Sequence, residues 1–265
     1  MTARPFSSTA SFYARHRPGI PDEVAALVAA AAPAGSPRRL LDAGTGTGLV
    51  IRALAGFFDE AIGVDVDADL LAEAASALAP EISAGAVELR ESPAEDIRLP
   101  ESRRVHLVTV CRAFHWFDRP RFLAAAADAL VDDGALAVFG DRSIWAYDTG
   151  WKAEVVAVIR DMLGDRRRAG GGAYVEPSRD FADDIGDAGF RGIQRRVVPV
   201  RRVRSIDDVI GELHSTSFVS PAVLGDRAEA FDARVRERLV PIADERGLLL
   251  DDNAFEIITA LRPRR

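Results

Sequence analysis

The strongest constraint on the fold comes from residues 40–48, which read Leu-Leu-Asp-Ala-Gly-Thr-Gly-Thr-Gly. An apolar strand runs here directly into a turn with three glycines, and glycine supplies the positive φ angles and close backbone approach that such turns need. The apolar residues after Gly48 recur at helical spacing, so the turn is expected to open a helix. Backbone N–H groups at a helix start attract polar or anionic ligand groups. The stretch predicts a nucleotide-like ligand, although three glycines alone also fit a purely structural turn.

The remainder of the chain alternates short apolar runs with helical patterns, which is typical of βαβ units and a parallel sheet. Strands are expected at residues 39–42, 61–66, 87–91, 105–111, 134–139, 194–203 and 255–261. Helices are expected at 21–32, 48–56, 68–79, 120–131, 151–163, 180–188, 206–214 and 221–243. We therefore predict an α/β fold: a Rossmann-like, doubly wound, mostly parallel seven-stranded sheet. The long excursion after residue 140 predicts a helical cap, and residues 1–18 form either a tail or an N-terminal lid.

Composition excludes several classes of function. The net charge is −7 and no concentrated basic tract is present, which argues against a nucleic-acid partner. The single cysteine, Cys111, forms no internal disulfide, which fits a reducing compartment. Because no signal-type segment and no apolar run of membrane-spanning length occurs, we expect a cytoplasmic protein with no membrane partner.

Two acidic residues near the glycines narrow the ligand. Asp42 directly precedes the turn, where a carboxylate suits a ligand that carries a cation and would repel a pyrophosphate. This disfavours a nicotinamide dehydrogenase. Asp65 ends the second strand about twenty residues beyond the glycines, where an acid accepts hydrogen bonds from ribose hydroxyls. The other interpretation of Asp65 is a helix N-cap, a role that Asp67 fits better.

These features resemble the class I S-adenosylmethionine-dependent methyltransferases over residues 13–139. Residues 40–48 look like the first motif of that family, and Asp65 matches its ribose-binding acid. The loop at residues 91–96 resembles the one that faces the adenine. Residues 110–118, Val-Cys-Arg-Ala-Phe-His-Trp-Phe-Asp, are similar to a signature of small-molecule methyltransferases related to trans-aconitate methyltransferase. Tyr13 with Arg17-Pro18 resembles the lid motif of that group, whereas Arg112 stands where many relatives carry glutamine.

The resemblance implies S-adenosylmethionine (SAM) as cofactor and a set of residues that contact it. These are Tyr13, Arg17, Asp42, Ala43, Gly44, Thr45, Gly46, Asp65, Val66, Ala94, Glu95, Cys111, Arg112 and Trp116. It also divides the chain into an N-terminal lid and helix (1–37), a SAM-binding core (38–140), and remaining strands with a helical substrate cap (141–265).

The acceptor side is less constrained. Strand ends point into the ligand crevice of such a sheet, so His115 is the candidate catalytic residue, as a base or as a group that shapes the pocket. No metal-ligand spacing occurs in the sequence, and no metal is expected. Candidates for substrate binding, from a histidine and aromatic residues outside the predicted sheet, are Trp145, Trp151, Tyr174, His214 and Phe218.

We predict a SAM-dependent methyltransferase that acts on an oxygen, carboxylate or hydroxyl, of a small-molecule metabolite or natural product. Nitrogen and carbon acceptors stay open, as does a SAM-binding protein with a cyclase-type activity and no methyl transfer. Methylation of a nucleic acid or protein is disfavoured by the acidic balance. A homodimer is left open as the assembly.

Overall fold

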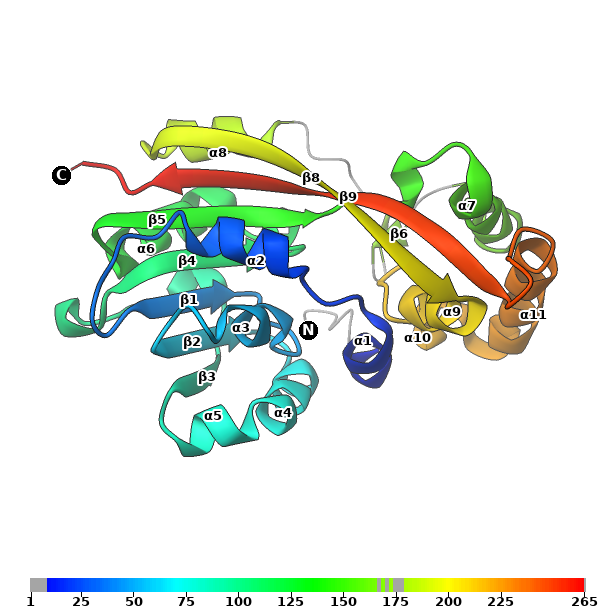
Figure 1. The fold of residues 1–265 in the computed structure, drawn as a ribbon, viewed down its shortest axis with the longest axis horizontal. Helices are drawn as coiled ribbons and strands as arrows, with labels where there is room; N and C mark the ends of the chain where they lie inside the picture. The colour runs from blue at the N-terminus through cyan, green and yellow to red at the C-terminus, as the bar shows by residue number, and fades with distance from the viewer. Residues whose placement is uncertain (1–8, 166–167, 170–171, 174–178, 265) are drawn as a thin grey trace. The chain divides into compact units, whose positions relative to one another are not determined.

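A seven-stranded sheet is the central feature of the computed structural model, which describes residues 9–165, 168–169, 172–173 and 179–264. The strand order is β3-β2-β1-β4-β5-β9-β8 (Figure 1). The strands are β1 (Arg39–Ala43), β2 (Glu60–Asp65), β3 (Val87–Glu91), β4 (Val105–Cys111), β5 (Leu130–Asp141), β8 (Arg191–Ser205) and β9 (Leu248–Leu261). Pairing is parallel from β3 to β5 and antiparallel between β5 and β9. The predicted Rossmann-like, mostly parallel sheet is confirmed.

The chain divides into two compact units. The sheet unit comprises Gly19–Asp141, Pro177–Val198 and Phe255–Arg265, and the helical unit comprises Met1–Pro18, Arg142–Glu176 and Pro199–Ala254. The predicted segment 1–37 is split between them at residue 18, and the predicted segment 141–265 contributes to both.

The sheet unit also holds helices and short helical turns. They are α2 (Asp22–Ala29), α3 (Leu49–Leu54), α4 (Ala68–Ala77), α5 (Ala79–Ser83), α6 (Arg119–Ala129) and α8 (Phe181–Asp187), with short turns η1 (Ala94–Asp96), η2 (Glu101–Arg103) and η3 (Phe114–Trp116). Phe122 and Leu123 of α6 and Ile185 of α8 share one buried cluster with Leu41, Val64 and other strand residues. These two helices therefore cover the sheet through continuous apolar contact.

The helical unit has its own core. Its elements are α1 (Ala10–His16), η4 (Ile144–Ala146), α7 (Gly150–Leu163), β6 (Arg168–Ala169), β7 (Gly172–Ala173), α9 (Ile206–His214), α10 (Pro221–Leu224), η5 (Gly225–Arg227) and α11 (Ala228–Leu239). Buried residues of α7, α9 and α11 form its apolar cluster, among them Val155, Ile210 and Phe231.

Two predicted element boundaries are wrong for local reasons. The helix expected at 221–243 is broken, because Gly225 has φ 58° and ψ −131°, outside the helical region. The strand expected at 255–261 already begins at Leu248, where alternate residues such as Leu249 and Asp251 are buried. Within the described part of the chain, none of the helices has the length and apolar character needed to cross a bilayer.

Candidate functional site

The glycine turn lies between the carboxyl end of β1 and the start of α3. Gly44, Gly46 and Gly48 have φ angles of 70°, 54° and 78°, the left-handed region that a Cβ disfavours. The amides of Gly44 and Thr45 both donate to the carbonyl of Val64 at 2.9 Å, so the turn is fixed to the end of β2.

Gly44 brings this turn against the loop that follows β4. A Cβ added at Gly44 would lie 2.6 Å from the Ala113 Cβ and 3.4 Å from the Phe117 ring. A Cβ at Gly46 would meet no atom within 4 Å, so the backbone there is open to a ligand. Glycine is required at position 44 by both backbone angle and packing.

Asp65 is fixed beside the turn by two backbone donors. The Gly46 amide donates to Oδ2 at 2.8 Å, and the Asp67 amide donates to Oδ1 at 3.0 Å. Burial raises the pKa of the Asp65 carboxyl, and these two hydrogen bonds oppose the shift. Asp67 caps α4 by accepting from the Asp69 and Leu70 amides, which confirms its predicted role as the N-cap.

Asp42 is a buried acid at the centre of the sheet. Its side chain is 1% exposed, and Oδ1 accepts a hydrogen bond from the Thr109 hydroxyl at 2.8 Å. Among the described residues, no hydrogen bond of good geometry reaches Asp42 Oδ2 or the buried hydroxyls of Thr45 and Thr47, although the Thr45 side chain lies near enough to Asp42 to lower the pKa of that carboxyl. Burial raises the pKa of Asp42 to about 7. Unpaired buried polar atoms at a turn with open backbone indicate a polar ligand.

The loop after β3 contributes Ala94 and Glu95. Ala94 is buried, whereas Glu95 Oε1 accepts a hydrogen bond from the Asp118 amide at 2.8 Å and so ties this loop to the start of α6. Val66, which follows β2, is 58% exposed and is free of core packing. These three residues lie, like the turn, in loops that leave the carboxyl ends of parallel strands, where open α/β sheets bind ligands.

His115 and Trp116 lie in the loop after β4. Phe114 anchors this loop by packing edge-on against Phe181 and Phe122, with ring centroids 5.0 and 5.9 Å away. His115 and Trp116 are both exposed, with ring centroids 4.9 Å apart. One short turn, η3, therefore exposes both an imidazole and an indole side chain.

Cys111 and Arg112 precede this loop. Cys111 is the last residue of β4 and pairs with Phe139 of β5. Arg112 has a φ of 59° and donates from Nε to Asp141 Oδ1 at 2.5 Å. The sequence identifies Arg112 as a candidate but not its partner, because Asp141 lies 29 residues further along the chain, at the end of the next strand, β5.

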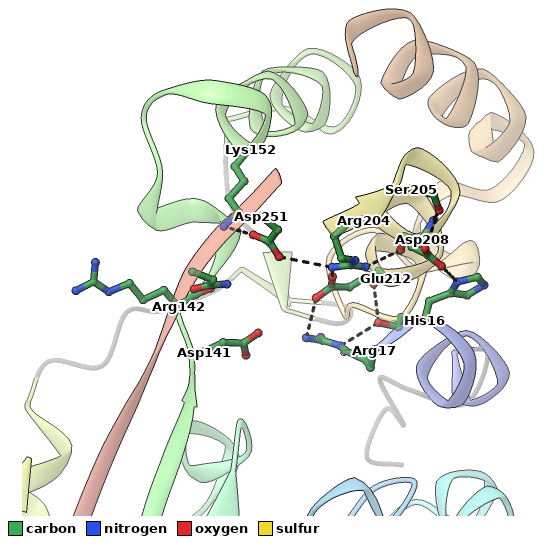
Figure 2. Close-up of polar contacts among 12 residues, drawn as sticks. His16, Arg17, Asp141, Arg142, Lys152, Arg204, Ser205, Asp208, Glu212 and Asp251 are labelled. Carbon is green, nitrogen blue, oxygen red and sulfur yellow. Dashed lines mark hydrogen bonds and ion pairs between the residues drawn. The ribbon is translucent and has the colours of Figure 1, made fainter. Parts of the chain in front are cut away.

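Tyr13 and Arg17 belong to the helical unit. The Arg17 guanidinium lies 5.1 Å from the Tyr13 ring centroid, and its Nε donates to Ser215 Oγ at 3.0 Å. Arg17 also pairs with Glu212 at 3.6 Å. Figure 2 shows that Glu212 is shared with Arg204, which continues through Asp251 to Lys152 as a chain of ion pairs.

The five predicted substrate-binding residues differ in their surroundings. Trp145 and Phe218 pack edge-on with centroids 5.6 Å apart, and Trp151 Nε1 donates to the Leu250 carbonyl at 2.9 Å. His214 is buried, with Nε2 2.8 Å from Asp232, which is the environment of a core histidine. Tyr174 lies outside the described residues.

A cavity of about 490 Å³ opens in the helical unit. Its lining comprises Trp145, Ala146, Tyr147, Asp148, Ala153, Val156 and Arg160. Of the predicted substrate-binding residues within the described part of the chain, Trp145 is the one that lines it.

Comparison with known proteins identifies the family. Residues 41–138 match the family model described as a methyltransferase domain. A candidate methyltransferase of Dictyostelium discoideum is 29% identical over 223 residues, which cover 80% of this chain and 76% of that protein.

Two solved structures have the same fold. A candidate type II methyltransferase from Anaeromyxobacter dehalogenans is 21% identical, with a TM-score of 0.62, over 94% of this chain and 99% of its own. The [4+2]-cyclase SpnF is 18% identical, with a TM-score of 0.55, over 92% of this chain and 82% of its own.

The matched domain contains the glycine turn, Asp42, Asp65 and the His115-Trp116 loop. A geranyl diphosphate methyltransferase of the same fold, 15% identical with a TM-score of 0.51 over 91% of this chain and 85% of its own, has been solved in complex with SAM. The chain therefore contains a methyltransferase domain at residues 41–138 and shares the fold of class I SAM-dependent methyltransferases.

Proposed function

We propose that this enzyme transfers the methyl group of SAM to an oxygen of a small-molecule metabolite or natural product, either a carboxylate or a hydroxyl. The observation that carries the proposal is the packing of Ala113 against Gly44, which joins the cofactor turn to the loop that presents His115 and Trp116. This packing supports a proposed cofactor side and a proposed acceptor side that are in contact within the sheet unit.

The residues of the turn fit SAM. Asp65 holds a carboxylate at the end of β2, where it would accept hydrogen bonds from the ribose hydroxyls. The unpaired oxygen of Asp42 and the hydroxyls of Thr45 and Thr47 would face the polar, cationic part of the cofactor. Ala94 and Glu95 are proposed to border the adenine, on the resemblance of their segment to the family motif. When bound, SAM supplies an electrophilic methyl group on a sulfonium.

Methyl transfer is an in-line displacement, so the protein must align the acceptor and exclude water. His115 is exposed in η3, after β4, and imidazole is the side chain that enzymes use most often as a general acid or base. For a hydroxyl acceptor, its imidazole would take the proton as the oxygen attacks. A carboxylate is already a nucleophile, and His115 would then only orient it.

The net charge supports a small-molecule substrate over a nucleic acid, because a chain with a net charge of −7 has no general attraction to phosphates. Trp145 and the cavity that it lines provide an aromatic wall suited to a small organic molecule.

Labelled methyl transfer tests the proposal. The protein is incubated with SAM that carries a tritiated methyl group and a metabolite extract, and the labelled product is then treated with alkali. A methyl ester releases volatile labelled methanol, a methyl ether retains its label at oxygen, and N- or C-methyl products are identified by mass spectrometry. Label on nitrogen or carbon contradicts the oxygen acceptor.

The second candidate is a cyclase-type activity, which the fold shared with SpnF favours. In that case SAM binds but no label leaves it. The same incubation separates the two functions, because SAM binding without labelled product in any extract supports the cyclase and contradicts methyl transfer.

A further inference from the structure

Arg112 has an unusual backbone conformation at the start of the loop that follows β4 and carries His115 and Trp116. Among the residues that the structure describes, it is the one non-glycine residue with a positive φ, 59°. A Cβ disfavours this region, so the conformation persists only where the surroundings impose it. The position directly follows Cys111, the last residue of β4, and precedes the loop that carries His115.

Contacts from two other strands impose this conformation. The Arg112 amide donates to the Phe139 carbonyl at 3.0 Å, and Nε donates to Asp141 Oδ1 at 2.5 Å. The guanidinium lies 5.5 Å from the centroid of Phe255, which is the register partner of Asp141 on β9. Gly140 leaves room for the side chain, since a Cβ there would lie 3.3 Å from Arg112 Cγ.

The ion pair is largely withdrawn from water. The side chains of Arg112 and Asp141 are 12% and 11% exposed, so solvent screens their attraction weakly. An arginine fork held by a carboxylate and a ring has a fixed orientation. The contacts of the Arg112 side chain therefore restrain the backbone of the same residue.

The positive φ of Arg112 places the next residue, Ala113, against the glycine turn. Ala113 Cβ is the atom that a Cβ on Gly44 would meet at 2.6 Å, and the Ala113 carbonyl accepts from the Trp116 amide at 2.9 Å. A different φ at Arg112 would move Ala113 away from Gly44 and change the presentation of His115 and Trp116.

We propose that Arg112 is a positioning residue, whose ion pair with Asp141 and contact with Phe255 hold the loop after β4 against the glycine turn and thereby set cofactor affinity. The proposal rests on SAM binding at that turn.

The test measures binding of S-adenosylhomocysteine by calorimetry, with thermal unfolding of each variant alongside. We expect Arg112→Gln and Asp141→Asn each to weaken binding about tenfold, and the double variant to lose no more than either single one, since the two groups act as a unit. Arg112→Gly is expected to bind more tightly than Arg112→Gln, because glycine adopts the positive φ without the side-chain contacts to Asp141 and Phe255.

The matched control is Arg119→Gln. Arg119 also pairs with a carboxylate, Asp184, and lies 5.6 Å from a phenylalanine ring, that of Phe181, but at the start of α6. Even if Arg119→Gln loses as much thermal stability as Arg112→Gln, its affinity for S-adenosylhomocysteine should stay within about twofold of that of the unaltered protein.

The outcomes separate the inference from the proposed function. If the unaltered protein binds no S-adenosylhomocysteine, SAM binding at the turn is wrong and the inference falls with it. If it binds and Arg112→Gln binds equally well, only the positioning role is overturned. Equal weakening in Arg112→Gln and Arg119→Gln also overturns it, because the effect is then one of stability.

Discussion

Thr109 donates its hydroxyl hydrogen to Asp42 Oδ1 at 2.8 Å, and the two residues are register partners on β4 and β1. The strand order reverses between these two strands, which is where open α/β sheets bind their ligands. Thr109 thus orients a buried carboxylate and leaves its second oxygen, Oδ2, without a partner among the described residues. This geometry makes Asp42 sensitive both to pH and to a bound cation.

The stability of the ligand-free protein should fall as pH rises from 3.8 to about 7. Burial raises the folded-state pKa of Asp42 from 3.8 to about 7, so the folded protein binds more protons than the unfolded chain in this interval. The stabilising contribution is complete below pH 3.8 and is lost as pH passes the folded pKa, by about 4 kcal/mol in all. Urea unfolding at pH 5 to 8 measures this slope. For Asp42→Asn, the slope of the unfolding free energy against pH should be smaller by up to one proton. Parallel pH profiles for the variant and the unaltered protein would contradict the role of Asp42.

Cofactor binding should release a proton from Asp42. A cation bound beside the turn favours the ionised carboxylate, so SAM affinity is expected to rise between pH 6 and 8 in the unaltered protein and to stay nearly constant in Asp42→Asn. Calorimetric titration in two buffers of different ionisation enthalpy measures the released proton directly. A binding enthalpy independent of the buffer at pH 7 would refute the coupling.

Asp65 and Asp67 should respond differently to substitution. Asp65→Ala is expected to weaken SAM binding by about 2 kcal/mol, since charge-assisted hydrogen bonds to the ribose are lost. Asp67→Ala removes the cap of α4 and should cost about 1 kcal/mol of stability with cofactor affinity almost unchanged. Calorimetry and urea unfolding on both variants separate the roles. An exchange of the two phenotypes would show that Asp67 is the ribose ligand.

The features predictable from the sequence are those that depend on neighbouring residues in the chain. The glycine turn, the end of β2 at Asp65 and the cap at Asp67 follow from spacing along one strand–turn–helix unit. The Asp42–Thr109 bond and the Arg112–Asp141 pair join different strands, so they depend on strand order and register. A single sequence contains no direct signal for either of these.

The helical unit was the least predictable part for the same reason. His214 is predicted to bind substrate because it lies on a helix outside the sheet, and its surroundings depend on residues distant in the sequence: Nε2 lies 2.8 Å from Asp232 Oδ1, and the ring centroid lies 5.2 Å from that of Phe12. Similarly, the segment with Tyr13 and Arg17 was assigned from a short motif, whereas the contacts of Arg17 come from α9, almost two hundred residues away.

The contact between α1 and α9 provides a stability test within the helical unit. Gly211 lies in α9, and a Cβ there would come within 2.3 Å of the His16 ring. His16 Nδ1 lies 3.5 Å from Asp208 of the same helix, so the ring is held in place over the glycine. Glycine normally destabilises a helix interior by about 1 kcal/mol relative to alanine, and here it allows the close approach of α1.

Gly211→Ala should therefore destabilise the protein despite the higher helix propensity of alanine, by about 1 to 3 kcal/mol of overpacking. In a His16→Ala background the clash is absent, and the same change should be neutral or should stabilise by up to about 1 kcal/mol. A double-mutant cycle from urea unfolding measures the coupling between the two positions. Gly186→Ala in α8 is the matched control, since a Cβ there would meet Ile193 only at 3.4 Å. If Gly211→Ala destabilises equally with and without the His16 ring, α1 does not pack on Gly211 through that ring.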